Sequence, residues 1–292
     1  MACIPEDAFG KDYEAIILLD IASDWSDLSI DGTQIAYSYT FKQVEGNKLY
    51  SIHARKGNKE INTKITFTFL PLLVLQGSFG YDYAQGNMSL YSSDATEPTI
   101  SLIKAKWRGG TTNTADKHKR NYKIKSLNFK GKGQDISLLG MREDNNWILD
   151  AGQIDLFRLR NRIATEIWND FATKPYYASK EPKAKSGVTG KVVEVILNNE
   201  YRGIYSLTEA MDRKELKLKK YDDKNQEFHG QLWKVSSWDK ATFWDIDKDY
   251  DNTQETWHAF ETKYPDIEDV NPTDYSPLYE AIDFVANSND ET

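Results

Sequence analysis

The chain has 292 residues, with 37 Lys or Arg against 45 Asp or Glu, and its formal net charge is −8 at pH 7. This length and an aromatic content of 13% favour a folded protein of two domains and exclude intrinsic disorder. The diffuse negative charge disfavours nucleic-acid binding. The sequence contains no run of eighteen or more apolar residues, so we expect no transmembrane helix.

The N-terminal tail, residues 1–9, carries the single cysteine of the chain, Cys3. One cysteine excludes an intrachain disulfide and a cysteine-based zinc site. The pair Ala2-Cys3 is followed by a polar stretch, a pattern that remains when a bacterial lipoprotein signal is removed. A lipid anchor on Cys3 would then place the protein at the bacterial cell envelope, outside the cytoplasm. The alternative is an early cysteine without a role in a cytoplasmic protein, since the apolar part of such a signal is absent. Both interpretations stay open.

Residues 10–65 are predicted to form a separate, small β-rich module. Short runs with β-strand character are separated by Asp-Gly and Gly-Asn turn pairs, and this spacing indicates an immunoglobulin-like sandwich or part of one. The expected strands are 15–19, 35–41, 48–54 and 64–70. The remainder, 66–292, is expected to form the second domain.

The most informative segment is basic: residues 104–132 contain ten Lys or Arg and one carboxylate, Asp116. Apolar and basic residues alternate before Gly109-Gly110 and again around Lys123 and Lys125, which predicts two strands joined by a loop rich in glycine and threonine. Backbone N–H groups, hydroxyls and cations converging on one place are typical of a phosphate site. The candidate phosphate-binding residues are Arg108, Gly109, Thr111, Thr112, Lys123 and Lys125.

Two alternatives weigh against this interpretation. A basic hairpin on an acidic protein is often only a solvated face. The glycine pair also matches neither the P-loop spacing nor the dinucleotide fingerprint.

Two further elements are predicted downstream. Residues 154–171 carry a broad apolar stripe at helical spacing, which predicts a helix packed on a core. Residues 191–207 read as a hairpin with its turn at Asn198-Asn199. The charged residues Asp155 and Glu166 lie on the polar face of the predicted helix, where they either form surface ion pairs or pair with a lysine of the basic hairpin.

The order of the segments that follow the basic hairpin resembles the CotH kinase family, the spore coat protein H-like group of atypical protein kinases. The resemblance is carried by residues 144–168, 191–213 and 257–266 and by an amphipathic helix that begins near Pro277, and it covers roughly residues 66 to 290. It implies a kinase-like architecture: a small β-rich lobe, a helix, a hinge and a mostly helical second lobe. The expected fold class is therefore α+β, with an N-terminal β-sandwich-like module, a kinase-like small lobe of antiparallel strands with a packed helix, and the start of a helical lobe.

The resemblance also implies ligands and roles. ATP and Mg²⁺ are the expected cofactors, a protein with Ser or Thr acceptors is the expected partner, and residues 207–211 around Glu209 would form the hinge that holds an adenine through its backbone. Asp155 or Glu166 would be the helix partner of a hairpin lysine.

Metal motifs are weak in this sequence. Asp245, Asp247 and Asp249 have the spacing of the first ligands of a calcium-binding loop. Tyr250, however, replaces the required glycine, and Thr256 replaces the required glutamate. An EF-hand is therefore excluded, and an irregular Ca²⁺ site is only a minor alternative. The same aspartates mimic the metal motif of CotH-like kinases, yet they lie too early in the chain, and we assign no metal role to them. The four histidines are dispersed without metal-ligand spacing.

In the CotH kinase family the catalytic aspartate and the metal motif follow the helix that begins here near Pro277. We therefore expect these catalytic residues beyond Thr292, and we expect this chain alone to be inactive. Two functions remain open: the nucleotide-binding part of an ATP-dependent kinase that phosphorylates Ser or Thr of a surface or coat protein, or a non-catalytic envelope binding or adhesion protein on a kinase-like scaffold.

Overall fold

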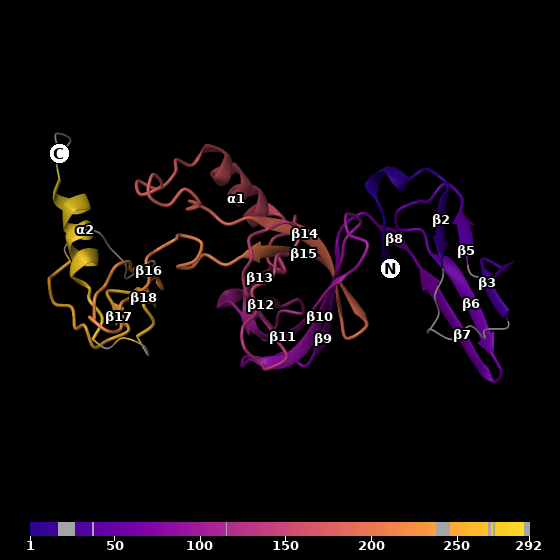
Figure 1. Cartoon of the computed structure of the whole chain (residues 1–292), viewed down its shortest axis with the longest axis horizontal. Helices are drawn as coiled ribbons and strands as arrows, with labels where there is room; N and C mark the ends of the chain where they lie inside the picture. Colours follow the sequence, from indigo (N-terminus) through magenta and orange to yellow (C-terminus); the bar gives the residue numbers. More distant parts are fainter. Residues whose placement is uncertain are drawn as a thin grey trace. The chain divides into compact units, whose positions relative to one another are not determined.

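The computed structural model describes residues 1–16, 27–36, 38–114, 116–237, 246–267, 270 and 272–288 (Figure 1). The chain divides into two compact units. Unit 1 comprises Met1–Ala164 and Thr189–Glu209, and unit 2 comprises Thr165–Val188 and Ala210–Thr292. The described residues contain eighteen strands and two α-helices, so the protein is mainly β and the expected α+β class is wrong.

The N-terminal part of unit 1 is built from short strands. A four-stranded sheet has the order β4-β3-β6-β7, β2 pairs with β5, and β1 pairs in parallel with β8. The strands are β1 (Ala2–Cys3), β2 (Tyr13–Ile16), β3 (Asp27–Ile30), β4 (Thr33–Ile35), β5 (Ser38–Phe41), β6 (Tyr50–Lys56), β7 (Lys59–Ile65) and β8 (Phe67–Thr68). Phe41, Tyr50 and Phe67 meet edge to face in its core. The predicted β-rich character is therefore present; the end of the predicted strand 15–19 lies outside the described residues, and the immunoglobulin-like assignment stays a prediction.

The rest of unit 1 is a closed seven-stranded barrel, a feature that the sequence analysis did not predict. Its strands follow the order β10-β11-β12-β13-β15-β14-β9. They are β9 (Leu72–Gly77), β10 (Ala84–Tyr91), β11 (Thr99–Arg108), β12 (Asn121–Leu127), β13 (Asn146–Asp150), β14 (Gly190–Leu197) and β15 (Glu200–Glu209). Strand β9 closes the ring, because it pairs antiparallel with β10 and parallel with β14.

Alternate residues of the barrel strands fill its interior. On β11 and β12 the fully buried side chains are Ile103, Ala105 and Ile124, and the adjacent strand β13 adds Trp147 and Leu149. Because successive strand residues point to opposite faces, the lysines between them lie on the outer face of the barrel. The predicted hairpin 191–207 is confirmed as β14 and β15, with Asn198 and Asn199 at positive φ in the turn.

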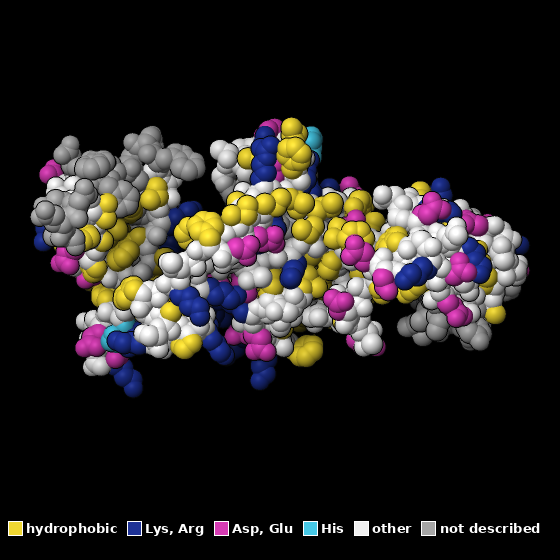
Figure 2. Space-filling view, turned by 90° about the horizontal axis from the view of Figure 1, so that it is seen from above, with side chains coloured by type: hydrophobic (Ala, Val, Ile, Leu, Met, Phe, Trp, Pro, Cys, Tyr) yellow, Lys and Arg dark blue, Asp and Glu magenta, His cyan; other side chains and the backbone are white. Residues whose placement is uncertain are grey.

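Helix α1 (Arg160–Phe171) differs from the prediction in its start and in its buried face. The segment before Arg160 forms turns. The apolar stripe is largely open, with Ile163 51% and Phe171 66% exposed, whereas Arg162 is buried. Figure 2, a view from above, shows hydrophobic side chains lying open on the surface. The Arg162 guanidinium occupies the space that a side chain at Gly190 would need, since its Nη1 would lie 2.2 Å from a Cβ there.

Unit 2 corrects the expectation of a mostly helical second lobe. Its described strands β16 (Leu232–Val235), β17 (Thr256–Trp257) and β18 (Phe260–Tyr264) form a small sheet of order β16-β18-β17. Helix α2 (Ser276–Asn287) packs Leu278 and Ile282 on an aromatic cluster with Trp257, Phe260 and Tyr275. The rest of its described chain is mostly turns and irregular backbone, because it lacks a helical repeat of apolar residues.

Neither helix of the described residues has the length and apolar character needed to cross a bilayer.

The assignment of inner and outer faces on β13 can be tested by protein stability. Leu149→Ala removes a fully buried side chain and should lower the free energy of unfolding by about 2–5 kcal/mol, measured by urea denaturation. Ile148→Ala, the adjacent position on the half-buried outer face, is the matched control and should cost clearly less. Equal losses at both positions would contradict the assignment of inner and outer faces.

Candidate functional site

The basic hairpin predicted from the sequence is confirmed. Strands β11 and β12 pair antiparallel, with Lys104 opposite Lys125 and Lys106 opposite Lys123. Tyr122 and Ile124, which alternate with Lys123 and Lys125 on β12, are buried. Four lysines therefore lie in two cross-strand pairs on one outer face of the barrel.

Three of these lysines surround one aromatic ring. The Nζ atoms of Lys104, Lys106 and Lys125 lie 5.2, 5.0 and 5.4 Å from the ring centroid of Tyr83. The ring face attracts cations, which offsets part of the repulsion among the ammonium groups. Burial and the neighbouring Lys104 and Lys106 lower the pKa of Lys125, and burial raises the pKa of the Tyr83 hydroxyl. We call Tyr83, Lys104, Lys106 and Lys125 the lysine cluster.

The charge of the lysine cluster is not neutralised by the described part of the chain. None of its three lysines forms an ion pair with a carboxylate among the described residues. Lys123 adjoins the cluster in the next cross-strand pair. An anion of several charges is the ligand that such a face suits best.

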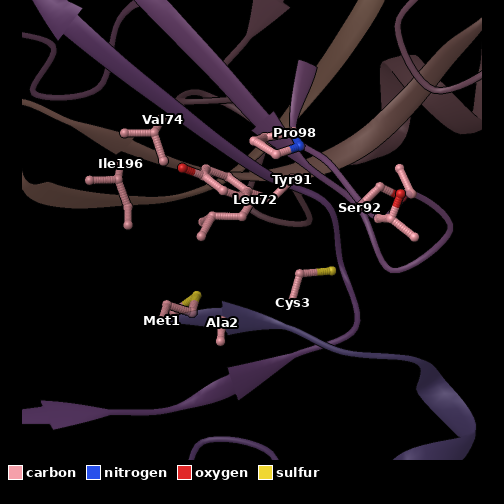
Figure 3. A pocket seen from close by; sticks show the side chains of 11 residues that line it. Met1, Ala2, Cys3, Leu72, Val74, Tyr91, Ser92, Pro98 and Ile196 are labelled. Atoms are coloured by element: carbon pink, nitrogen blue, oxygen red, sulfur yellow. The ribbon is translucent and has the colours of Figure 1, made fainter. Parts of the chain in front are cut away.

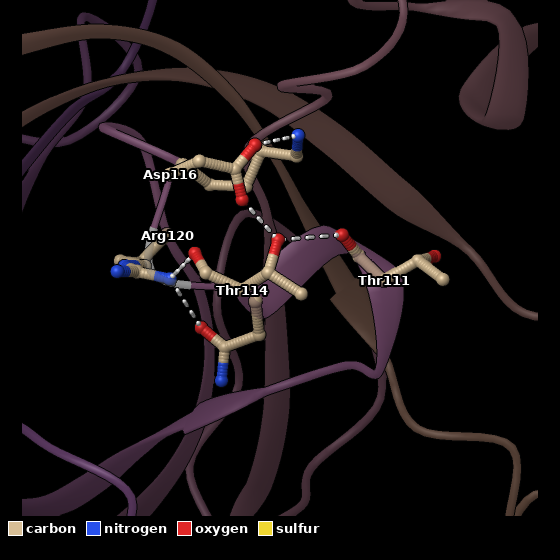
Figure 4. Close-up of polar contacts among 6 residues, drawn as sticks. Thr111, Thr114, Asp116 and Arg120 are labelled. Carbon is tan, nitrogen blue, oxygen red and sulfur yellow. Dashed lines mark hydrogen bonds and ion pairs between the residues drawn. The ribbon is translucent and has the colours of Figure 1, made fainter.

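The loop between the two strands is held by its own hydrogen bonds (Figure 4). The Thr114 hydroxyl donates to Asp116 at 2.5 Å, and its oxygen lies 3.3 Å from the carbonyl oxygen of Thr111. Arg120 donates to the carbonyl of Thr114 at 2.5 Å. Lys117 and Thr114 together lower the pKa of Asp116 to about 2. The loop is therefore pre-shaped, although several of its polar groups already have partners.

The other predicted phosphate-binding residues lie at the loop end of the hairpin. Gly109 has φ +103°, and a Cβ there would lie 2.2 Å from Thr112 Oγ1, so only glycine fits. Thr112 Oγ1 accepts a hydrogen bond from Asn121 at 3.2 Å. Burial lowers the pKa of the Arg108 guanidinium, and the negative charge of Asp150 partly opposes this shift. Lys125 thus belongs to the lysine cluster, Lys123 adjoins it, and Arg108, Gly109, Thr111 and Thr112 form the loop end; their role in binding stays a prediction.

Lys119 fastens this loop to the barrel. Its ammonium group donates to the carbonyls of Ala151, at 3.1 Å, and of Ile204, and it lies 4.0 Å above the ring of Tyr205. Burial, followed by the nearby Arg158, lowers the pKa of Lys119 to about 8, against a smaller opposing effect of Asp150. Lys119 therefore connects the loop to the end of β13 and to the middle of β15.

Glu209, expected at the hinge, is buried at the end of β15. Its carboxylate accepts backbone N–H groups of Arg142, at 3.0 Å, and of Thr189, at 2.8 Å. This side chain therefore joins three chain segments, and adenine binding by the hinge backbone stays a prediction.

The two proposed helix partners lie in different settings. Asp155 precedes helix α1, accepts the N–H groups of Phe157 and Arg160, and pairs with the Arg160 side chain at 3.5 Å. Glu166 lies within α1. Its pairing with a lysine of the hairpin stays a prediction.

The aspartates considered for a metal are only partly described. Asp245 lies outside the described residues, and Asp247 is exposed. Asp249 Oδ1 accepts hydrogen bonds from Trp257 Nε1 at 3.0 Å and, with the suitable tautomer, from His258 Nε2 at 3.2 Å. These contacts, Trp257 first, lower the pKa of Asp249. Calcium binding here stays an untested alternative.

Cys3 lines a cavity of about 500 Å³ in unit 1 (Figure 3). Apolar side chains such as Leu72, Val74 and Ile196 share this lining. The Cys3 Sγ atom lies 3.9 Å from the carbonyl oxygen of Phe69, and burial raises the pKa of the Cys3 thiol. A lipid on Cys3 stays a proposal.

The comparison with protein families settles the relationship. The family model described as CotH kinase protein matches residues 105–292, which begin inside β11 and include the rest of the basic hairpin, but not Tyr83 or Lys104. The chain belongs to the CotH kinase protein family. The resemblance inferred from the sequence is thereby confirmed, although the match begins at residue 105 instead of about 66. No curated protein matches the chain.

Sequence reasoning did not assign Tyr83, Lys104 and Lys106 to the CotH domain's candidate site. The two lysines alternate with buried residues on the same strand as Arg108, and this pattern could have identified them. Tyr83 had no sequence signal, because the barrel brings it to the lysines from the segment before β10.

The pKa of Lys119 predicts a pH dependence of stability. The unfolded lysine has a pKa of 10.5 and the folded one about 8, so between these values the unfolded state binds a proton that the folded state has lost. The contribution of Lys119 to the free energy of unfolding should therefore rise with pH from about 8 to 10.5. Lys119→Met should abolish this rise in urea unfolding measured at about pH 7 and 10.

Lys191→Met, at an exposed lysine on β14, is the control and should retain the rise. A constant difference in stability between the parent protein and Lys119→Met across this range would contradict the lowered pKa.

Proposed function

We propose that the CotH domain of this chain is the ATP-binding part of a phosphotransferase that acts on Ser or Thr of a surface or coat protein. The observation that carries this proposal is the lysine cluster, whose three ammonium groups gather at Tyr83 without a carboxylate partner among the described residues. Membership of the CotH kinase protein family supports the choice of a nucleotide over other polyanions.

The geometry fits the phosphates of a nucleotide. Lysine is a compact, flexible point charge, so several lysines can adjust to a chain of phosphates without a fixed fork geometry. Binding an anion would relieve the repulsion that lowers the pKa of Lys125. The pre-shaped loop after β11 adds backbone N–H groups at the end of the same hairpin.

The described residues around the lysine cluster do not fit Mg²⁺. Magnesium in kinase sites is held by carboxylates together with the phosphates, and none of the three lysines has a carboxylate partner in the described ranges. We therefore assign no metal ligand, no catalytic base and no step of phosphoryl transfer to these residues. The chain's own contribution at this site is to bind and position an anion.

The second candidate function is non-catalytic binding or adhesion at a bacterial envelope. The N-terminal β module and the position of Cys3 favour this candidate. Both candidates allow an extracytoplasmic location, and they differ in the transfer of the γ-phosphate.

Nucleotide affinity tests the role of the lysines. Lys123→Ala, Lys125→Ala and Lys104→Ala should each weaken binding of a fluorescent ATP analogue by about 1–3 kcal/mol, or roughly 5- to 150-fold, because each removes a charge-assisted contact. Lys64→Ala, at an exposed lysine of the N-terminal module, is the control and should leave the affinity unchanged. Unchanged affinity in all three test variants, with melting temperatures like that of the parent protein, would remove these lysines from the site.

A transfer assay separates the two candidate functions. The chain is incubated with Mg²⁺, γ-labelled ATP and a Ser/Thr-rich protein. Label transfer that Lys125→Ala reduces would establish the phosphotransferase. ATP binding without transfer is the result expected of the nucleotide-binding part alone, whereas absence of ATP binding under these conditions would favour a binding protein on this scaffold.

A further inference from the structure

A tight turn in unit 2 gathers three potential metal ligands. Asp222 and Glu227 form an antiparallel bridge, in which the Asp222 N–H donates to the Glu227 carbonyl at 3.1 Å and the Glu227 N–H to the Asp222 carbonyl at 3.2 Å. Residues directly opposite each other in such a bridge project their side chains to the same face. His229 follows two residues after Glu227, and its ring nitrogen lies on that side too, since the donor atoms of all three residues lie within 4.8 Å of one another.

The spacing of the donor atoms suits a metal better than a hydrogen bond. His229 Nε2 lies 3.7 Å from Glu227 Oε2, which exceeds a normal N–H···O distance. In a tetrahedral site with bonds of roughly 2.1 Å, neighbouring ligand atoms lie about 3.4 Å apart. Small rotations of exposed side chains would therefore bring the trio to coordination geometry.

Asp222 is already oriented by its turn. Its Oδ1 accepts the N–H groups of Lys224 and Asn225, and its Oδ2 accepts the Asn225 side-chain amide at 2.8 Å. The second lone pair of Oδ2 stays available to a cation, and contacts of this kind orient metal-binding carboxylates in proteins.

The ligand set indicates the class of metal. An imidazole nitrogen beside two carboxylates matches Zn²⁺ and similar transition metals better than Ca²⁺ or Mg²⁺, which prefer oxygen ligands alone. The two carboxylates also balance the charge of a divalent ion.

A cavity adjoins the trio. His229 lines a cavity of about 630 Å³ in unit 2. Its lining includes the aromatic residues Tyr177, Phe228 and Trp233 and the lysines Lys180, Lys217 and Lys219. A cation at the edge of a basic, aromatic cavity would give an anionic ligand group a direct partner.

We propose that Asp222, Glu227 and His229 bind one divalent transition-metal ion of the zinc class, with its remaining position open to water or to an anionic group in the adjoining cavity. This site lies apart in sequence from the lysine cluster, and it does not depend on the proposed nucleotide binding.

Metal titration of the whole, untagged 292-residue chain tests the site. Isothermal titration with Zn²⁺ should give one ion per chain, and Co²⁺ should give the visible absorption of a tetrahedral site with nitrogen and oxygen ligands. His229→Ala should abolish this absorption and weaken Zn²⁺ binding at least tenfold, and Glu227→Gln should also weaken it. These residues are exposed, so the variants should keep the circular dichroism and melting temperature of the parent protein without metal.

His53→Ala is the matched control. His53 is a half-buried histidine that also lies beside a glutamate, with Nδ1 3.6 Å from Glu60 Oε1, but it is not part of a three-ligand group among the described residues. His53→Ala should leave both signals unchanged. Absence of stoichiometric binding by the parent protein, unchanged binding in His229→Ala, or an equal loss in His53→Ala would each overturn the proposal.

Discussion

The double pairing of strand β9 is the constraint on which unit 1 depends. This strand is hydrogen-bonded to β10 on one side and, in parallel, to β14 on the other, and the second pairing turns an open sheet into a barrel. Closure removes the edge strands and encloses the apolar core. It also decides which residues of every strand face outward, since alternate positions must point away from the enclosed core.

The lysine cluster follows from this constraint. Shifting the pairing of β11 with β12 by one residue would move lysines into the barrel and Ile103 or Ile124 into water. The core therefore fixes the register that places Lys104 opposite Lys125 and Lys106 opposite Lys123. Burial of the apolar side chains offsets the repulsion between the lysines, so the protein can present concentrated positive charge on this outer face.

Local alternation explains why the hairpin was predictable and the barrel was not. The alternation of Ile103 and Ala105 with lysines is contained in one segment, so it identified both faces of β11 correctly. The closing pair of β9 and β14 joins residues more than a hundred positions apart, such as Leu72 and Glu194, and no local pattern encodes that contact. The helical second lobe was expected from resemblance alone, and the chain of unit 2 lacks the apolar periodicity that would have supported it.

Helix α1 shows a different limit of sequence patterns. The later part of its apolar stripe lies on a helix, as predicted, whereas residues 154–159 form turns, and a stripe does not reveal which face is covered. Arg162 lies against the backbone because Gly190 leaves room for a guanidinium on the outer face of β14. A glycine on β14 thus accounts for the face of α1 that is buried. The proposed metal ligands of unit 2 were missed for a similar reason. Their spacing arises from a bridge between Asp222 and Glu227, which no local sequence pattern predicts.

The acidic character of the chain does not prevent anion binding at the hairpin. A net charge of −8 is distributed over 292 residues, and at physiological ionic strength charges beyond about 8 Å are largely screened. What an approaching phosphate meets is therefore the local arrangement, in which three ammonium groups lie within 5.4 Å of one ring centroid. The same reasoning applies with opposite sign at Asp222, Glu227 and His229, where two carboxylates and an imidazole lie within 4.8 Å of one another. The sign of the local charge is the reason for proposing an anion at the first site and a cation at the second.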